Sequence, residues 1–280
     1  MADLEHLPPV RDVADRFGLR ARRSLGQNFL FDDNLLDRIA RAAGDLATTE
    51  VVEVGPGPGG LTRALLRAGA PRVVAVEKDP RCIAALQDLV GAAQGRLKLV
   101  EADALSLELA TLTTTAPLIA GNLPFNAATE ILMRLLDRAE RVKGMVLMFQ
   151  REVGDRIAAE PGSKDYGRLS VMVQWRCAVT RCFEVPARAF VPPPKVQAVV
   201  LRLTPRAEPL FPAEPEALRQ VLMAAFGQRR KTLRNAMSTL SDHAVELLES
   251  AGIDPGLRAE RLTIAQFCAL ARAWRACEDK

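Results

Sequence analysis

Side chains that can bind a ligand recur at the ends of four strand-like segments of this sequence, at Gly55, Glu77, Asp103 and Asn122. A glycine lets the backbone approach a ligand closely, a carboxylate accepts hydrogen bonds, and a side-chain amide both donates and accepts them. Each of these residues alone is typical of an ordinary strand end. Their recurrence at four successive strand ends instead indicates one shared binding site.

The stretch NLPF, residues 122–125, is unusual for the turn that should follow a short apolar strand. Asn122 supplies an amide, the ring of Pro124 holds φ at about −65°, and Phe125 adds a large aromatic ring. A routine turn does not need these three features together. We therefore expect this loop to hold a ligand.

The loop at residues 55–60 places Pro56 and Pro58 among glycines, after a buried strand and ahead of a helix. Its G-x-G-x-G spacing differs from the G-x-G-x-x-G of dinucleotide-binding loops, and its prolines lack the backbone N–H groups that would hold a pyrophosphate. The loop therefore favours a cofactor without phosphate. Glu77, at the tip of the next strand, is placed to bind ribose hydroxyls, and Asp103 is placed to accept a hydrogen bond from an adenine amine.

Strands and helices must alternate to bring these residues to one edge. The pattern predicts strands at 50–55, 72–79, 96–103, 117–122 and 144–150, and helices at 33–44, 60–69, 80–90 and 128–140, the first capped by Asp32 or Asp33. Such alternation implies right-handed crossovers and an α/β fold with a doubly wound, mostly parallel sheet. Ligands of these sheets lie outside the carboxyl ends of the strands, where the four residues are expected.

The sequence predicts two domains. The first, residues 1–205, begins with an arginine-rich arm at 1–31 and ends in two strand-like segments at 183–190 and 198–203. A proline-rich stretch follows, and residues 216–280 carry almost only helical patterns. We therefore expect a smaller, all-helical second domain at 206–280.

Composition narrows the class of protein. The five cysteines are scattered and odd in number, which favours reduced thiols in a cytosol over a disulfide framework. With only two histidines, a structural metal site is not expected. No apolar run reaches the roughly 18 residues that a membrane span needs. The first residues lack the features of a secretory signal and are too acidic for a mitochondrial presequence. We expect a cytoplasmic protein that binds neither a membrane nor a metal.

Five short motifs together resemble the class I S-adenosylmethionine-dependent methyltransferases, and among them the ribosomal RNA adenine dimethyltransferase family. They are GQNFL (26–30), EVGPGPGGLT (53–62), VEKD (76–79), EADAL (101–105) and GNLPFN (121–126). The resemblance continues through GRLSVMVQ (167–174), FVPPPKVQAVVLRL (190–203) and AFGQRRKTLRNAM (225–237). The last two motifs point to the branch that acts on small-subunit RNA.

The resemblance implies a Rossmann-like methyltransferase fold with S-adenosylmethionine as cofactor. It also implies a role for each residue of the site. Asn28 and the backbone of Leu30 contact the cofactor, Gly55 its methionine moiety, Glu77 its ribose and Asp103 its adenine, while Asn122 stands where cofactor and target meet.

The same resemblance implies a target amine of adenine, which is a poor nucleophile because its lone pair is delocalised into the ring. We expect the side-chain oxygen of Asn122 and a backbone carbonyl of Leu123 or Pro124 to accept hydrogen bonds from that amine. Phe125 would stack on the unstacked base, and Phe190 would form the second face of a clamp. The family usually has tyrosine at position 125, so no hydroxyl acts there in this chain.

The segment AFGQRRKTLRNAM contains the cations Arg229, Arg230, Lys231 and Arg234, and no acid occurs between residues 217 and 241. A helix that begins near Gln228 would place three of these cations in its first turn, where they oppose the helix dipole. Such a charge run favours a phosphate partner over a simple solvated face. Arginines of the N-terminal arm flank the same groove on this hypothesis, namely Arg11, Arg16, Arg20, Arg22 and Arg23.

The implied activity is N6,N6-dimethylation of two adjacent adenosines in the hairpin loop near the 3′ end of small-subunit (16S) ribosomal RNA. The expected partner is the immature 30S subunit, and the enzyme is expected to be a monomer. Two alternatives stay open. One is the related large-subunit RNA methyltransferase of the macrolide-resistance type, and the other is a ribosome-assembly factor without catalysis.

Overall fold

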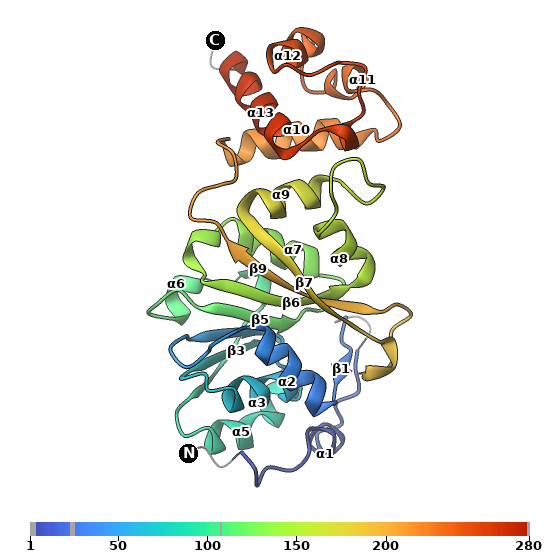
Figure 1. Cartoon of the computed structure of the whole chain (residues 1–280). Helices are drawn as coiled ribbons and strands as arrows, with labels where there is room; N and C mark the ends of the chain where they lie inside the picture. Colours follow the sequence, from blue (N-terminus) through green and yellow to red (C-terminus); the bar gives the residue numbers. More distant parts are fainter. Residues whose placement is uncertain (1–3, 23–25, 107, 279–280) are drawn as a thin grey trace. The chain divides into compact units, whose positions relative to one another are not determined.

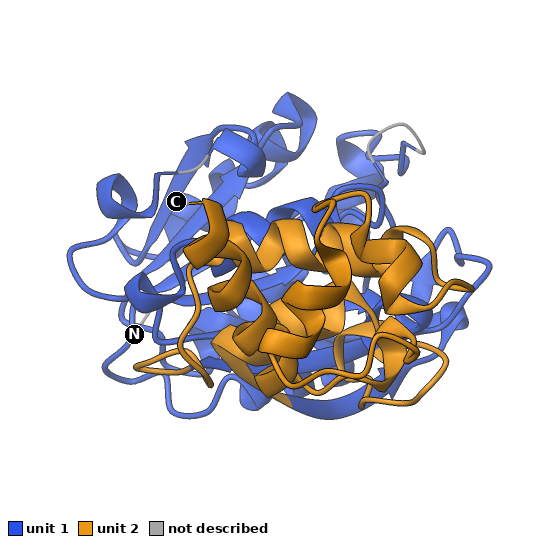
Figure 2. Cartoon of the chain, turned by 90° about the horizontal axis from the view of Figure 1, so that it is seen from above, with its two compact units in different colours: residues 1–154, 180–205 blue, residues 155–179, 206–280 orange. Residues whose placement is uncertain are grey.

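A computed structural model describes residues 4–22, 26–106 and 108–278 of the chain (Figure 1). The chain divides into two compact units, which Figure 2 colours separately. Unit 1 comprises Met1–Gly154 and Thr180–Pro205, and unit 2 comprises Asp155–Val179 and Arg206–Lys280. One division between the units falls after Pro205. The segment Asp155–Val179 groups with the C-terminal helices in unit 2.

The main sheet has seven strands, all of which lie in unit 1 except the start of β7. They are β2 (Val51–Val54), β3 (Val73–Glu77), β4 (Leu97–Glu101), β5 (Leu118–Asn122), β6 (Gly144–Gln150), β7 (Cys177–Val185) and β9 (Ala198–Pro205). Their order across the sheet is β4-β3-β2-β5-β6-β9-β7. The pairs from β4 to β6 are parallel and β9 runs antiparallel to β6, which confirms the mostly parallel sheet that the sequence predicts.

The helices expected at 33–44, 60–69 and 128–140 are present and differ mainly in where they end, whereas α6 and α8 are not predicted by the sequence patterns. Around the sheet lie α2 (Asp33–Ala42), α3 (Gly60–Arg67), α4 (Pro80–Ala85), α5 (Gln87–Ala92), α6 (Leu109–Leu112), α7 (Ala128–Leu136) and α8 (Arg151–Ile157), with the turns η2 (Ala104–Ser106), η3 (Ala139–Arg141) and η4 (Ala187–Ala189). The carboxylate of Asp32 accepts a hydrogen bond from the Leu35 N–H and caps α2. The helix expected at 80–90 is divided at Leu86 into α4 and α5.

Both faces of the sheet are covered. Val51 and Val73 pack in one buried cluster with Leu65 of α3, and the next residues along the same strands, Val52 and Val74, are also fully buried. Because successive strand residues point to opposite faces, this continuous burial requires helices on both sides. Figure 1 shows α2, α3 and α5 on one side of the sheet and α7 on the other.

The N-terminal arm adds two elements that the sequence patterns do not predict. Residues Val10–Arg16 form α1, and Phe29–Leu30 form the short strand β1. Strand β1 pairs antiparallel with β8 (Phe190–Val191), so that Leu30 lies opposite Phe190. The arm therefore forms one strand of a second, two-stranded sheet, which lies at the carboxyl edge of the main sheet.

The strand order reverses between β2 and β5, which makes their carboxyl ends the topological switch point of the sheet. Gly121 permits the close approach of these two strands, because a Cβ at this position would lie 2.7 Å from the Val54 carbonyl oxygen. Gly55 follows β2 with φ +71°, a conformation that favours glycine. The sequence thus places a crevice beside both Gly55 and Asn122.

Unit 2 is helical. Its elements are α9 (Arg168–Arg176), α10 (Pro215–Gly227), α11 (Leu233–Met237), α12 (Ala244–Ser250), the turn η5 (Ala259–Arg261) and α13 (Ile264–Glu278). The rings of Tyr166, Phe226 and Phe267 pack in sequence in its core, with successive centroids 6.2 and 5.4 Å apart. The Trp175 indole N–H donates to the Phe211 carbonyl at 2.7 Å and fixes the chain that leads into α10.

Two kinds of feature are absent from the described residues. Among them, no helix is long and apolar enough to cross a membrane. Within the same described part of the chain, no group of three or more His, Cys, Asp or Glu side chains is placed to hold a metal ion.

Candidate active site

One pocket of unit 1 lies at the carboxyl edge of the sheet and takes most of its lining from five segments. They are residues 26–30 of the arm, 53–58 at the end of β2 and in the loop after it, 76–78 at the end of β3, 102–104 after β4, and 122–125 at the end of β5 and in the loop after it. The pocket is thus lined by all the residues that the sequence assigns to cofactor and catalysis: Asn28, Leu30, Gly55, Glu77, Asp103, Asn122, Leu123, Pro124 and Phe125. Their roles remain predictions, but their common location is a property of the fold.

The arm forms one wall of this pocket and is tied to the loop after β5. The side-chain Nδ2 of Asn122 donates a hydrogen bond to the main-chain oxygen of Asn28 at 2.9 Å. A carbonyl can only accept, so this contact fixes which end of the Asn122 amide faces the arm. The side-chain oxygen of Asn122 accepts no hydrogen bond from the described residues and is the acceptor available to a ligand.

Phe29 closes the arm over the glycine loop. Its ring lies so near Gly57, which has φ +55°, that a Cβ there would be 3.1 Å from the ring. Glycine is therefore required at this position both by conformation and by the approach of the ring. The loop and the arm pack directly on one another along one side of the pocket.

Glu77 ends β3 as a carboxylate held by backbone donors. Its Oε1 accepts from the Lys78 N–H at 2.8 Å and the Asp79 N–H at 2.9 Å, and its Oε2 accepts from the Gly57 N–H at 3.2 Å. Burial raises the pKa of Glu77, while these three donors act in the opposite direction. A carboxylate has about four acceptor positions, so the bound geometry leaves one position on Oε2 for a hydroxyl.

Asp103 lies two residues after the end of β4 and remains half-exposed at the pocket. Its Oδ1 accepts from the Leu105 N–H at 2.9 Å, and the Lys78 ammonium lies 3.4 Å from its Oδ2. The Leu105 N–H, with a smaller contribution from Lys78, lowers the pKa of Asp103. The group is therefore an ionised acceptor, as the hydrogen bond expected from an adenine amine requires.

The loop after Asn122 distinguishes between the two carbonyls that the sequence leaves open. The Pro124 carbonyl accepts from the Ala127 N–H at 2.9 Å and closes a turn. The Leu123 carbonyl accepts no hydrogen bond from the described residues, although the Leu123 side chain is buried. The Leu123 carbonyl oxygen therefore has both lone pairs free to accept hydrogen bonds. Leu123 directly follows Asn122 in the chain.

The expected clamp of Phe125 and Phe190 is only half formed. Phe125 is partly exposed at the pocket, but Phe190 is 1% exposed and belongs to the core. The two rings meet edge to face, with centroids 6.3 Å apart and planes at 66°. In this conformation Phe190 supports the Phe125 ring from behind and presents no second stacking face. Phe190 is buried because it lies in β8, where it pairs with Leu30 of β1.

Glu53 is a pocket residue that the sequence patterns did not single out as functional. It lies in the middle of β2, is 1% exposed, and lines the pocket, yet neither carboxylate oxygen has a hydrogen-bond partner. Burial raises its pKa to about 8, the nearby Thr62 hydroxyl lowers it, and the charge of Glu77 raises it further. An acid inside an otherwise apolar strand, VVEV, is the sequence signal that identifies such a group.

The basic segment of unit 2 differs from its predicted secondary structure. The expected helix from Gln228 is wrong: α10 ends at Gly227, residues 228–231 form a turn, and α11 begins only at Leu233. No helix dipole therefore opposes Arg229, Arg230 or Lys231. An unfavourable helix dipole therefore gives no reason to expect an anionic partner here. The cations themselves are on the surface.

The four cations are not equivalent. An Arg229 Nη2 donates to the carbonyls of Lys164 and Tyr166 at 2.7 and 3.1 Å, so this guanidinium holds a loop of unit 2. Arg230, Lys231 and Arg234 are exposed, and none has an ion pair or side-chain hydrogen bond with a described residue. These three are the cations free to bind phosphate.

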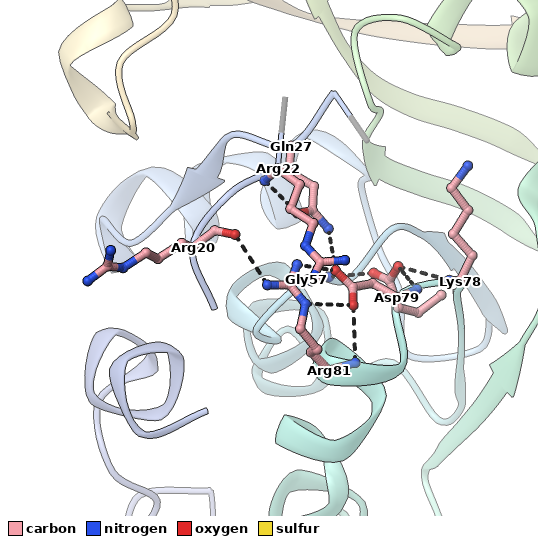
Figure 3. A network of polar contacts seen from close by, with 8 residues as sticks. Arg20, Arg22, Gln27, Gly57, Lys78, Asp79 and Arg81 are labelled. Atoms are coloured by element: carbon pink, nitrogen blue, oxygen red, sulfur yellow. Dashed lines mark hydrogen bonds and ion pairs between the residues drawn. The ribbon is translucent and has the colours of Figure 1, made fainter. Parts of the chain in front are cut away.

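Arginines of the N-terminal arm have partners inside unit 1. Arg16 lies 3.6 Å from the Asp88 carboxylate, and the Arg11 guanidinium lies 5.1 Å from the centroid of the Phe31 ring. The backbone of Arg20 and Arg22 takes part in the contacts shown in Figure 3. Arg23 lies outside the described residues. The proposed flanking of an RNA groove by these arginines stays a prediction.

The pocket suits S-adenosylmethionine on its own chemistry. The prolines at 56 and 58 remove N–H groups that a phosphate would need, while Glu77 and Asp103 offer acceptors for ribose and adenine. The unpartnered carboxyl of Glu53 in a buried site calls for a cationic neighbour, because a lone ionised carboxylate is costly in a low-dielectric environment. A cofactor that carries positive charge and no phosphate meets these three requirements.

Comparison with known proteins identifies relatives over almost the whole chain. The family model of ribosomal RNA adenine dimethylases matches residues 18–275. The "Ribosomal RNA small subunit methyltransferase A" of Paramagnetospirillum magneticum is 55% identical, over 98% of this chain and 96% of that protein. The protein of the same name from Rhodospirillum rubrum is 54% identical, over 95% of this chain and 92% of that protein.

Two solved structures share the fold. A dimethyladenosine transferase from Plasmodium falciparum covers 86% of this chain and 95% of its own, with a TM-score of 0.75 and 25% identity. The 23S rRNA methyltransferase ErmE covers 89% of this chain and all of its own, with a TM-score of 0.66 and 26% identity. With a family match of this extent around the pocket described above, the chain belongs to the ribosomal RNA adenine dimethylase family of S-adenosylmethionine-dependent methyltransferases.

Proposed function

We propose that this protein transfers methyl groups from S-adenosylmethionine to the N6 atoms of two adjacent adenosines in the hairpin loop near the 3′ end of small-subunit (16S) ribosomal RNA. Each adenosine receives two methyl groups. The observation that carries the proposal is the shared pocket of Asn122 and the acceptors at four strand ends, with Asn122 linked to the arm through Asn28.

The cofactor is held by residues of unit 1. S-adenosylmethionine supplies a methyl group activated on a sulfonium. Asn28 and the backbone of Leu30 contact it from the arm, and Gly55 lets the chain approach its methionine moiety. Glu77 binds ribose with the acceptor position left on Oε2, and Asp103 accepts from the adenine amine. Glu53, whose oxygens lack partners, balances positive charge in the buried end of the pocket.

The target amine is held by acceptors rather than activated by a strong base. In the first transfer the Asn122 side-chain oxygen and the Leu123 carbonyl would accept from its two N–H groups, and in the second transfer one of them would accept from the N–H that remains. These bonds favour a pyramidal nitrogen with its lone pair directed at the methyl group, and the proton that each methylated nitrogen loses passes to solvent. Pro124 limits the backbone conformations of the loop, so these acceptors are positioned before the target arrives. Positioning and hydrogen bonding of this kind account for much of enzymatic rate enhancement.

The Phe125 ring stacks on the extruded adenine. Stacking on an aromatic ring contributes about 1–3 kcal/mol per base, comparable to the few kcal/mol that unstacking costs. Phe190 holds this ring edge-on from behind. Since phenylalanine lacks a hydroxyl, the ring face alone serves the target.

Arg230, Lys231 and Arg234 bind phosphates of the RNA, and their exposure without partners among the described residues supports this role. Arg229 positions the loop that carries them. The substrate is the immature 30S subunit, on which the enzyme acts as a monomer in the cytoplasm. The free cations and the name of the family support an RNA substrate.

The large-subunit alternative has weaker support. The relatives above 50% identity carry the name of a small-subunit enzyme, whereas the 23S rRNA methyltransferase ErmE is 26% identical. A non-catalytic assembly factor would not need the full set of Gly55, Glu77, Asp103 and Asn122 in one pocket. The two readings differ in whether methyl transfer occurs at all.

Labelled methyl transfer to isolated ribosomal subunits that lack the modification tests the proposal. We expect label in 30S subunits and not in 50S subunits, and digestion to nucleosides should release N6,N6-dimethyladenosine. Label confined to 50S subunits would support the large-subunit alternative. No label in either subunit, with S-adenosylmethionine binding intact, would support the assembly factor.

A further inference from the structure

Asp79 is a buried carboxylate with its hydrogen-bonding capacity filled. It is 2% exposed. Its Oδ1 accepts from the backbone N–H and the Nε of Arg81 at 3.1 and 3.0 Å, and its Oδ2 accepts from Arg81 Nη2 at 2.6 Å and Gln27 Nε2 at 3.0 Å. A carboxylate has about four acceptor positions, so none remains for a ligand. Any role of Asp79 in the pocket must act through its neighbours.

These neighbours hold the N-terminal arm. Gln27, which lines the pocket, receives the Arg22 N–H on its Oε1 at 3.1 Å, and its own N–H donates to the Arg22 carbonyl at 3.3 Å. Arg81 Nη1 reaches the Arg20 carbonyl at 3.5 Å. Figure 3 shows the arm and the start of α4 joined by this set of contacts. We call Asp79, Arg81 and Gln27 the arm latch.

Asp79 also holds the wall of the pocket that Glu77 forms, opposite the arm. The Asp79 N–H donates to Glu77 Oε1 at 2.9 Å, and Glu77 Oε2 receives the Gly57 N–H. Asp79 is therefore bonded through its backbone to the ribose-binding acid and through its side chain to the arm. It does not itself line the pocket.

We propose that Asp79 is a positioning residue for the cofactor, which acts through the arm latch to hold the arm and the Glu77 loop at a fixed separation before the cofactor binds. The latch keeps Gln27 and Asn28 at the pocket wall and spares the cofactor the cost of ordering them. The arm has other ties, the β1–β8 pair and the Asn28–Asn122 bond. Loss of the latch therefore loosens residues 20–22 and 26–28 without releasing the whole arm.

The charge of Asp79 is suited to this task. The paired Arg81 guanidinium lowers its pKa to about 2, and the Gln27 amide acts in the same direction. The carboxylate is thus ionised at neutral pH, and its hydrogen bonds are charge-assisted, which makes them stronger than neutral ones. A neutral amide cannot replace it, because its NH2 group would face the donors of Arg81 or Gln27.

The decisive variant is Asp79→Asn in the full-length chain, compared with Asp37→Asn. Asp37 forms an exposed ion pair with Arg67 at 2.7 Å, away from the pocket. We expect Asp79→Asn to raise the Kd for S-adenosylmethionine about ten-fold by calorimetry. At saturating cofactor its kcat should stay within about two-fold of the parent, since the latch does not touch the reacting atoms. Asp37→Asn should leave both values unchanged.

Hydrogen–deuterium exchange without cofactor tests the latch independently of the proposed function, on which only the affinity prediction rests. In Asp79→Asn, residues 20–22 and 26–28 should exchange faster while β2 and β3 keep the parent's protection. Unchanged exchange in the arm would overturn the proposal, whatever the protein methylates. Faster exchange throughout unit 1 would also overturn it, because that pattern indicates a general structural role.

The Gln27→Met variant covers the case in which Asp79→Asn does not fold, because it removes only the arm side of the latch. Gln27→Met alone should also speed exchange at residues 20–22 and 26–28. If both variants fold, their effects on the Kd should be non-additive, because each breaks the same contact. Additive effects would indicate that Gln27 acts only through direct contact with the cofactor and would contradict the latch.

Discussion

The side-chain amide of Asn122 donates a hydrogen bond to the main-chain oxygen of Asn28 at 2.9 Å, although 94 residues separate them in sequence. The residue expected to hold the target amine is therefore bonded to the segment expected to cover the cofactor. With Nδ2 engaged in this way, the Asn122 oxygen is the end left for the target. On the proposed roles, the cofactor site and the target site would share the side-chain amide of Asn122.

The ring of Phe125, and not a hydroxyl, should govern binding of the target base. We expect Phe125→Leu to lower kcat/KM for 30S subunits about ten-fold or more, because stacking contributes about 1–3 kcal/mol and leucine fills space without a π face. Phe125→Tyr should remain within about two-fold of the parent. Steady-state methyl transfer measures both. A Phe125→Leu variant with parental kcat/KM would show that the ring only packs against Phe190.

The basic turn of unit 2 should bind RNA through charge. Replacing Arg230, Lys231 and Arg234 by glutamine should flatten the dependence of log K on log salt by about 0.7–0.9 per lost phosphate contact. Titration of RNA binding across salt concentrations measures this slope. Lys98→Gln, which removes an exposed charge on β4, should leave the slope unchanged. The affinity for S-adenosylmethionine should not change in the triple variant, and an unaltered salt slope would exclude these cations from the RNA contact.

Glu53 should make the stability of the cofactor-free protein fall as pH rises. Its pKa is about 8 in the fold against 4.5 as its ordinary value, so the folded protein binds more protons than the unfolded chain between these values. The free energy of unfolding then decreases with pH across that window, by a few kcal/mol in total. Glu53→Gln cannot ionise and should lack this decrease. Denaturant unfolding at pH 5 and pH 9 measures it, and identical pH dependence in both proteins would contradict the buried, unpaired state of Glu53.

Gly121 should tolerate no side chain. A Cβ there would lie 2.7 Å from the Val54 carbonyl oxygen, whereas a Cβ at Gly91 in α5 meets nothing within 4 Å. We expect Gly121→Ala to destabilise unit 1 by about 1–3 kcal/mol and Gly91→Ala to be neutral or stabilising by up to about 1 kcal/mol. Thermal unfolding compares the two. Equal stability of both variants would mean that β2 and β5 can separate without cost.

The sequence was most informative where a residue's position depends on periodicity. Glu77 and Asn122 end strands whose apolar pattern is plain, and Asp103 follows such a strand by two residues, so their meeting at the carboxyl edge follows from the doubly wound sheet alone. The helix capped by Asp32 was predicted for the same reason, because its apolar face and its cap are both local features.

Features that depend on contacts between distant segments could not be predicted in this way. The bond from Gln27 to Asp79 spans 52 residues, and no local pattern specifies it. Phe190 was expected at a stacking face because it is aromatic, but its pairing with Leu30 buries it. The end of α10 at Gly227, which places Arg230 in a turn, has a local cause instead, because glycine is a poor helix former and commonly ends a helix.

Methyl transfer by the Asn122→Ala variant tests directly whether Asn122 holds the target amine. Labelled S-adenosylmethionine is incubated with unmodified 30S subunits, and calorimetry measures cofactor binding on the same preparation. The account predicts that transfer falls at least about 100-fold, the usual loss when a hydrogen bond made in the transition state is removed, while the variant still binds cofactor. Transfer within a few-fold of the parent rate would contradict the role of Asn122 as the residue that holds the target amine.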